Sequence, residues 1–167
     1  MTHPANRPHK VDKATGDFLF DLYQLLFSSN VSLRIKQRTL ETAAESQDSW
    51  RVVSITHAAL EHIAKNGSAK GLQRAHVLSR VDRASHLFER KQPLTQPELL
   101  EYFFEHDTSA LVTKAENAKD GTKHWSTLRA VPAGLFPSPS LFKVSMRKKT
   151  ELPWVIDQLE LAKPNVP

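Results

Sequence analysis

The chain has 167 residues, of which 40% are hydrophobic and 25% charged, and it contains no cysteine. This composition fits one globular core and excludes a disordered chain, a disulfide framework and a thiolate metal site. A net charge of +5 and a pI of about 9.6 favour nucleic acid as the partner. No stretch approaches the roughly 20 apolar residues of a membrane span, and residues 1–13 lack a signal-peptide core, so we expect a cytoplasmic protein.

The first part of the chain, residues 14–71, is expected to form a helical platform behind a flexible N-terminal arm at residues 1–13. Apolar residues at helical spacing support this expectation. Thr56 is a suitable N-cap, and Gly67 a suitable left-handed C-terminus, for the helix between them. The expected elements are helices at 17–28, 33–47 and 57–66, with a short strand or lead-in at 50–55.

After Gly71 the pattern changes to short strands separated by helices. Thr95 and Glu98 form a capping box, with Pro97 in the first turn, which predicts a helix that continues to Glu105. No internal repeat or low-complexity tract is present. The expected elements are strands at 72–79, 110–113 and 141–146, a helix or irregular loop at 80–91, and helices beginning at 114 and 152.

Two short segments, Ala75-His-Val-Leu-Ser-Arg80 and Leu111-Val-Thr-Lys-Ala-Glu-Asn117 followed by Gly121, stand out in this part of the chain. The first resembles the first strand of the HNH family, also called ββα-metal or His-Me finger nucleases, and the second is similar to that family's second strand and helix. The similarity covers residues 72–122. It implies a hairpin and helix that form a metal-dependent endonuclease site.

The resemblance implies that His76 is the general base and that Asn117 binds one Mg²⁺ or Mn²⁺ ion. A neutral imidazole can accept the proton of an attacking water, while a hard cation stabilises charge on the phosphate oxygens. The family usually supplies its second metal ligand from an Asp where this chain has Ala75. Asp107 or His124 is therefore expected to complete the metal site.

Basic residues around the finger and near the C-terminus are expected to contact phosphates. Such contacts give affinity and salt dependence without sequence specificity. The residues expected to bind nucleic acid are Arg74, Arg80, Arg83, Lys114, Lys119, Lys143, Arg147, Lys148 and Lys149.

The sequence therefore predicts an α+β protein, mainly helical, with an embedded ββα-metal finger at 72–122 and a C-terminal strand and helix within 123–167. The expected function is hydrolysis of phosphodiester bonds in double-stranded DNA. Cutting both strands would suit a restriction-type homodimer. The alternative is a regulator that binds nucleic acid without cleaving it, either through a helix-turn-helix-like unit at 55–88 or through a degenerate HNH finger.

Overall fold

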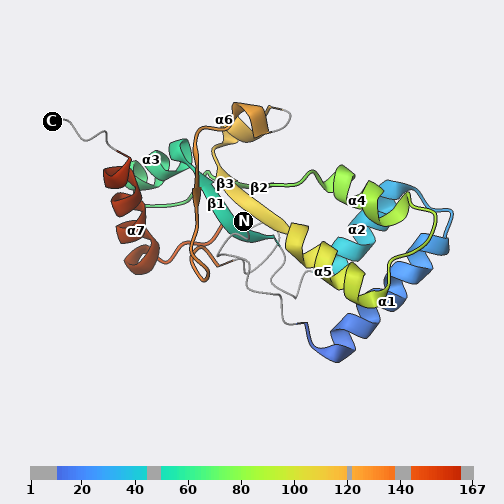
Figure 1. Ribbon diagram of the computed structural model, residues 1–167. Coiled ribbons are helices and arrows are strands. Elements are labelled where there is room, and N and C mark those ends of the chain that lie inside the picture. Colours follow the sequence, from blue (N-terminus) through green and yellow to red (C-terminus); the bar gives the residue numbers. More distant parts are fainter. Residues whose placement is uncertain (1–10, 45–49, 120–121, 138–143, 163–167) are drawn as a thin grey trace.

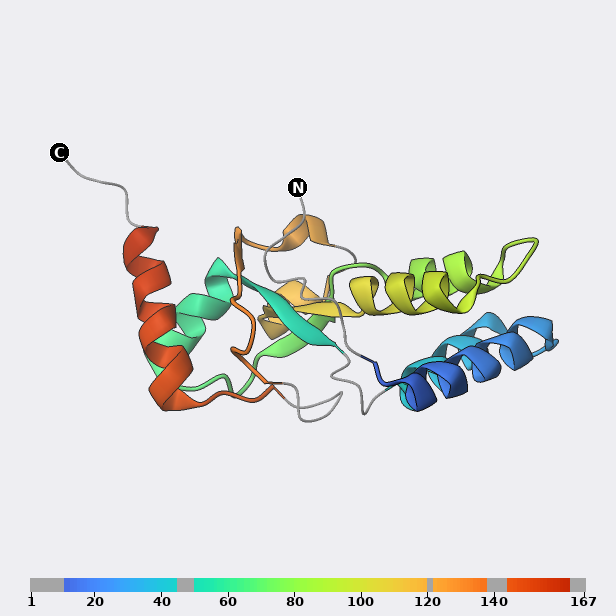
Figure 2. The ribbon, with the colours of Figure 1, turned by 60° about the horizontal axis from the view of Figure 1, so that its bottom comes forward.

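The computed structural model describes residues 11–44, 50–119, 122–137 and 144–162. Within these ranges the protein is α+β, with seven α-helices, one 3-10 helix and a four-stranded mixed sheet. The sheet lies between two groups of helices: α1, α2, α4 and α5 at one end, α3 and α7 at the other (Figures 1 and 2). The elements are α1 Lys13–Ser28, α2 Leu33–Ala43, β1 Arg51–Thr56, α3 His57–Asn66, β2 Gln73–His76, α4 Arg80–Phe88, α5 Gln96–His106, β3 Thr108–Val112, α6 Lys114–Asn117, η1 Thr122–His124, β4 Leu128–Ala130 and α7 Lys148–Leu161.

The strand order is β2-β3-β1-β4, so the sheet joins segments that are distant in sequence. β1 runs parallel to β3, and β2 and β4 run antiparallel to their neighbours. β1 belongs to the part of the chain expected to be a helical platform, yet it lies inside the sheet. It pairs with β3 on one side and with β4 on the other.

The helical group has its own apolar core, with residues from α1, α2, α4 and α5. Leu19, Tyr23 and Leu26 recur at helical spacing on α1 and face this core. The Tyr23 hydroxyl donates to the Leu87 carbonyl at 2.9 Å and accepts from the Leu94 N–H at 3.0 Å. These two bonds attach α1 to the last turn of α4 and to the connection between α4 and α5.

A second core joins the sheet to α3 and α7. The Thr56 side chain accepts from the Ala59 N–H, and Gly67 ends α3 in the left-handed conformation at φ 59°. Both features confirm the predicted caps. Ile55 of β1 and Ile63 of α3 are fully buried in this core.

Several sequence expectations differ from the structure. β2 lies between α3 and α4, so the segment 55–88 is not a helix-turn-helix. Residues 144–146 are not in a strand, and the rest of the expected strand at 141–146 lies outside the described residues. α7 begins at Lys148 rather than at 152, and β4 was not predicted. Among the described residues, no helix combines the length and apolar character needed to cross a bilayer.

Candidate functional site

The segment that resembles an HNH finger contains β2, α4, α5, β3 and α6. β2 pairs antiparallel with β3, and α6 begins two residues after β3 ends. Ala75, which replaces the family's usual Asp, is buried with Ala110 and Val112 against Trp125. A carboxylate at this position would lie in an apolar cluster, so the local packing favours alanine.

Glu116 is a structural residue that ties α6 to the sheet. Thr113 and Glu116 form a reciprocal capping box, a pattern that sequence reasoning missed here. The buried carboxylate also accepts from Thr56 Oγ1 at 2.8 Å, and from the Ser126 N–H and Oγ at 2.9 and 2.7 Å. Glu116, the first residue of the Glu-Asn pair that suggested a nuclease motif, is therefore explained by helix capping and by its buried hydrogen bonds.

Asn117 and His76 do not meet. The exposed Asn117 Nδ2 donates to Gln73 Oε1 at 2.7 Å, beside the end of β2 that pairs with Val112. His76 lies three residues further along β2, a separation of about 10 Å in a strand. Because side chains alternate along a strand, this odd spacing directs Gln73 and His76 to opposite faces of the sheet.

The expected metal ligands are also separated. Both oxygens of the buried Asp107 are engaged: Oδ1 accepts from Arg83 at 2.5 Å and Oδ2 from the Trp50 N–H at 3.1 Å. Asp107 precedes β3, Asn117 follows it, and His124 is exposed on η1. Nowhere in the described ranges do three His, Asp or Glu side chains form a group that could hold a metal ion. The predicted set does not fit Mg²⁺ or Mn²⁺.

The His76 imidazole is enclosed beside Trp50, with ring centroids 4.2 Å apart in an edge-to-face arrangement. Burial, together with the positive charges of Arg83, Arg80 and Arg74, lowers the pKa of His76 from 6.5 to about 3. Neither ring nitrogen has a hydrogen-bond partner among the described residues. An unpaired buried polar group costs about 1–3 kcal/mol, so this imidazole calls for an explanation.

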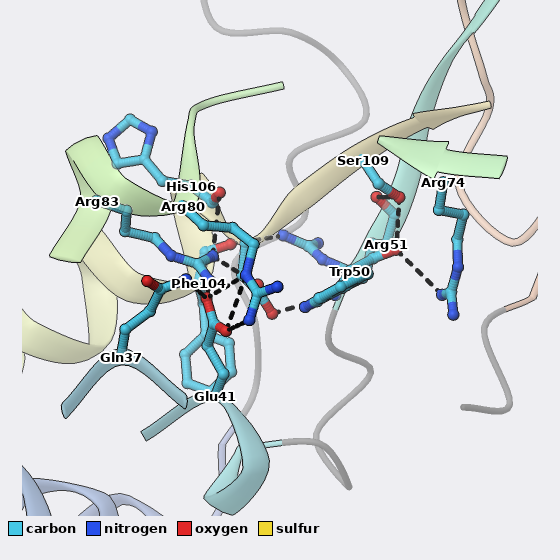
Figure 3. A network of polar contacts seen from close by, with 11 residues as sticks. Gln37, Glu41, Trp50, Arg51, Arg74, Arg80, Arg83, Phe104, His106 and Ser109 are labelled. Atoms are coloured by element: carbon cyan, nitrogen blue, oxygen red, sulfur yellow. Dashed lines mark hydrogen bonds and ion pairs between the residues drawn. The ribbon is translucent and has the colours of Figure 1, made fainter. Parts of the chain in front are cut away.

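Trp50 has a left-handed backbone, with φ 59°, immediately before β1. This conformation is uncommon for a bulky residue and stores roughly 1–3 kcal/mol of strain. The Trp50 N–H donates to Asp107, and its carbonyl accepts from Ser109 Oγ at 2.7 Å and from Arg74 at 3.4 Å (Figure 3). These contacts from β2 and β3 fix the conformation.

A buried ion-pair network joins the helical group to the sheet. Arg83 of α4 bridges Glu41 of α2 and Asp107 at the start of β3, and all three side chains are buried. Arg80 also pairs with Glu41 but remains partly exposed (Figure 3). Arg83, expected to bind nucleic acid, therefore has a structural role, whereas Arg80 reaches both the network and the surface.

An open hollow of about 450 Å³ lies between α2 and α4, lined by Arg34, Arg38 and Arg80 with Leu33, Gln37 and Val81. Arg34 and Arg38 are four residues apart on α2 and share one face. Both are exposed, and neither makes an ion pair with a described residue. We call this hollow the arginine groove. Sequence reasoning placed basic residues here but did not select Arg34 or Arg38 as binding residues.

A second hollow of about 360 Å³ lies on the other side of the β2–α4 connection. Its lining comes from residues 75–79, Asp82, Asn117, Lys119, Thr122 and Trp125, so it includes both His76 and Asn117. The connection between β2 and the start of α4 thus forms a ridge between the two hollows. Lys114 and Lys119 are exposed near it on α6 and just beyond, which agrees with their expected surface position.

Within the expected basic cluster near the C-terminus, Arg147 has a structural role. Arg147 forms an ion pair with the buried Glu151 and donates to the Gly134 carbonyl at 2.6 Å. The Lys148 ammonium lies beside Gly67, 3.5 Å from where a Cβ would stand, near the end of α3. Lys149 is exposed, and Lys143 lies outside the described residues.

No family model, curated protein or solved structure matches this chain. Among the described residues, three features bear on function. They are the arginine groove, the hollow beside α6 and the enclosed pair of Trp50 and His76. All three adjoin the β2–α4 ridge, because Arg80 lines the groove and also faces Trp50.

Proposed function

We propose that this protein binds nucleic acid, double-stranded DNA above all, through the arginine groove. The observation that carries the proposal is the lining of this groove, which contains three arginines and no acidic residue. Guanidinium groups bind phosphate oxygens in a bidentate manner and remain charged at all ordinary pH values. A row of them on one open surface suits a repeating polyanion better than a small neutral ligand.

The surroundings of the groove support the same proposal. The only acid on α2 is Glu41, which is buried in the ion-pair network and does not repel phosphates at the surface. Lys114 and Lys119 extend the positive charge to the other side of the ridge. The exposed apolar side chains of Ile35 and Val81 can contact sugar and base edges, as apolar residues do at such interfaces.

The proposal is tested by fluorescence anisotropy of a labelled DNA duplex at low salt. Arg34→Ala/Arg38→Ala removes two exposed charges from α2 and introduces good helix formers, so the fold should persist. The matched control, Lys65→Ala/Lys70→Ala, removes two exposed charges from α3 and the loop after it, and α3 lies at the opposite end of the molecule from α2 (Figure 1). We expect at least a tenfold loss of affinity in the arginine variant and a much smaller loss in the control. Equal losses would reject the groove as the binding surface.

Phosphodiester hydrolysis is a second candidate function, as the family resemblance suggests. It is favoured by one observation: an antiparallel strand pair followed by a short helix, with both His76 and Asn117 among the residues that line the hollow beside α6. The ring nitrogens of His76 are shielded, so the ring would have to turn before one of them could bind a water molecule in this hollow. A homodimer, if one forms, would place two such sites on the two strands of a duplex.

Cleavage is tested with supercoiled plasmid and Mg²⁺ or Mn²⁺, in parallel with EDTA and with the variants His76→Ala and Asn117→Ala. Nicking that needs the ion and both side chains would support hydrolysis at this site. Binding of the plasmid without nicking would leave the protein as a binding module. Nicking that survives in both variants would place the chemistry elsewhere.

A further inference from the structure

The Trp50 indole is surrounded by groups that bind anions. The guanidinium carbons of Arg80 and Arg74 lie 5.3 and 5.9 Å from the indole ring centroid. The His76 ring meets the same indole edge-to-face at 4.2 Å between centroids. Two cations and an imidazole thus converge on one aromatic side chain, and Arg80 is at the same time paired with Glu41.

The hydrogen-bonding capacity of the His76 ring is unused in this cluster. Both of its ring nitrogens are shielded and lack a hydrogen-bond partner among the described residues. The charged groups that face it come from two elements, Arg74 on β2 and Arg80 and Arg83 on α4. An imidazole in such surroundings stays neutral, and an anion that entered the cluster would both accept its N–H and favour its protonation.

We propose that His76, Arg74 and Arg80 form a binding site for one phosphate group, which the Trp50 indole covers until a phosphate enters from the arginine groove. Arg80 connects the arginine groove with this phosphate site, because it lines the groove and also faces the Trp50 indole. The inference rests on the proposed function only for the source of the phosphate. The site itself also predicts binding of inorganic phosphate.

The backbone at Trp50 supports a movable cover. Its left-handed φ of 59° is strained for a large side chain, and local contacts hold it in place. These contacts are made by the Trp50 backbone N–H and carbonyl, so the indole can turn about its side-chain torsions without breaking them. Such a rotation would expose the imidazole and both guanidinium groups to the incoming anion.

The enclosed position favours a phosphate at the end of a chain over one within a duplex. An internal phosphodiester carries a sugar on both sides and one negative charge, whereas a terminal phosphate carries one sugar and approaches two charges near neutral pH. A site built from two guanidinium groups and an imidazole favours the more highly charged anion. The chemical class of the ligand is therefore a phosphate monoester or free phosphate.

The experiment follows the side-chain nitrogens of His76 by NMR, with the signal assigned through its loss in His76→Gln. The whole chain is titrated with pH in sodium phosphate and in sodium chloride of the same ionic strength. We expect the pKa of His76 to be higher by at least about one unit in phosphate, which corresponds to a tenfold preference of the anion for protonated His76. Trp50→Ala, with its fold checked by circular dichroism, should bind phosphate several-fold more tightly.

Two further arms identify the source of the phosphate. The same titration uses a short duplex with a 5′-terminal phosphate and an identical duplex without it. A shift with the phosphorylated duplex alone supports recognition of ends, and a shift with inorganic phosphate alone supports a free-phosphate site. If His76 titrates identically in phosphate and chloride, in both the native chain and Trp50→Ala, the proposed site does not exist. A native chain that shows the phosphate-induced shift but does not bind the duplex would reject the groove as a DNA-binding surface and retain this site.

Discussion

Replacing Glu116 with Gln should destabilise the protein in a manner that depends on pH. Five donors bind this carboxylate: the N–H and hydroxyl of Ser126, the N–H and hydroxyl of Thr113, and the hydroxyl of Thr56. A glutamine amide keeps one oxygen and turns the other position into a donor. Donors that then face an NH₂ group are left unsatisfied in a buried place, at a cost of about 1–3 kcal/mol each.

The magnitude follows from the pKa of Glu116. Burial alone would raise this pKa, but the hydrogen bonds from Ser126, Thr113 and Thr56 outweigh burial and lower it from 4.5 to about 2. A lowering of this size contributes about 3 kcal/mol to the free energy of unfolding. Because the folded-state pKa is depressed, the contribution is fully present above the unfolded value of 4.5 and is lost as the pH falls toward 2.

The assay is urea unfolding of the native chain and Glu116→Gln over a series of pH values. Near pH 7 we expect the variant to be less stable by about 3 kcal/mol, with most of that difference gone by about pH 2. Glu101→Gln is the control, because Glu101 is an exposed carboxylate on α5 and its replacement should have little effect at any pH. A Glu116→Gln difference that is the same at both pH values would refute this account of the carboxylate.

Three further variants test the packing by urea or thermal unfolding. Arg83→Met leaves the buried carboxylates of Glu41 and Asp107 without this guanidinium group, so we expect a loss of about 3–5 kcal/mol, and native-like stability would contradict the ion-pair network. Tyr23→Phe removes two buried hydrogen bonds and should cost about 1–2 kcal/mol, whereas an unchanged midpoint would show that these bonds contribute nothing. Gly67→Ala forces a left-handed conformation on a residue with a Cβ, and its predicted cost of about 1 kcal/mol should appear as a lower Tm.

The elements that sequence predicted best are those whose signals are local. The α3 helix has its N-cap at Thr56 and its left-handed terminus at Gly67, and both lie within one short stretch of chain. The capping box at Thr95 and Glu98 likewise marked the start of α5. Caps of this kind are hydrogen bonds to nearby backbone groups, so they depend little on the rest of the fold.

The candidate site depends on contacts between residues that are distant in sequence, and local sequence patterns do not specify these contacts. Which face His76 occupies is decided by the register of β2 against β3, and this register also turns Ala75 toward Trp125. A Glu-Asn pair after a strand occurs in the HNH motif, but a glutamate at this position also fits a helix capping box. In the structure Glu116 belongs to a capping box with Thr113. Trp50 gave no sequence signal, because its neighbours come from β2, β3 and α4.

Arg34 and Arg38 could have been selected from the sequence. They are four residues apart on a helix that has no exposed acidic residue, and this spacing predicts a shared basic face. Their relation to Arg80 could not have been predicted, since it requires α2 to pack beside α4. That packing depends on the buried contact of Glu41 with Arg83.

The most direct test of the central claim is the salt dependence of duplex binding. If the three arginines of the groove neutralise three phosphates, the logarithm of the association constant should fall with the logarithm of salt concentration with a slope of about −2.7 or steeper. Arg34→Ala/Arg38→Ala should make this slope less steep by about 1.8, while Lys65→Ala/Lys70→Ala leaves it unchanged. An arginine variant with the native slope would show that the groove does not contact DNA phosphates.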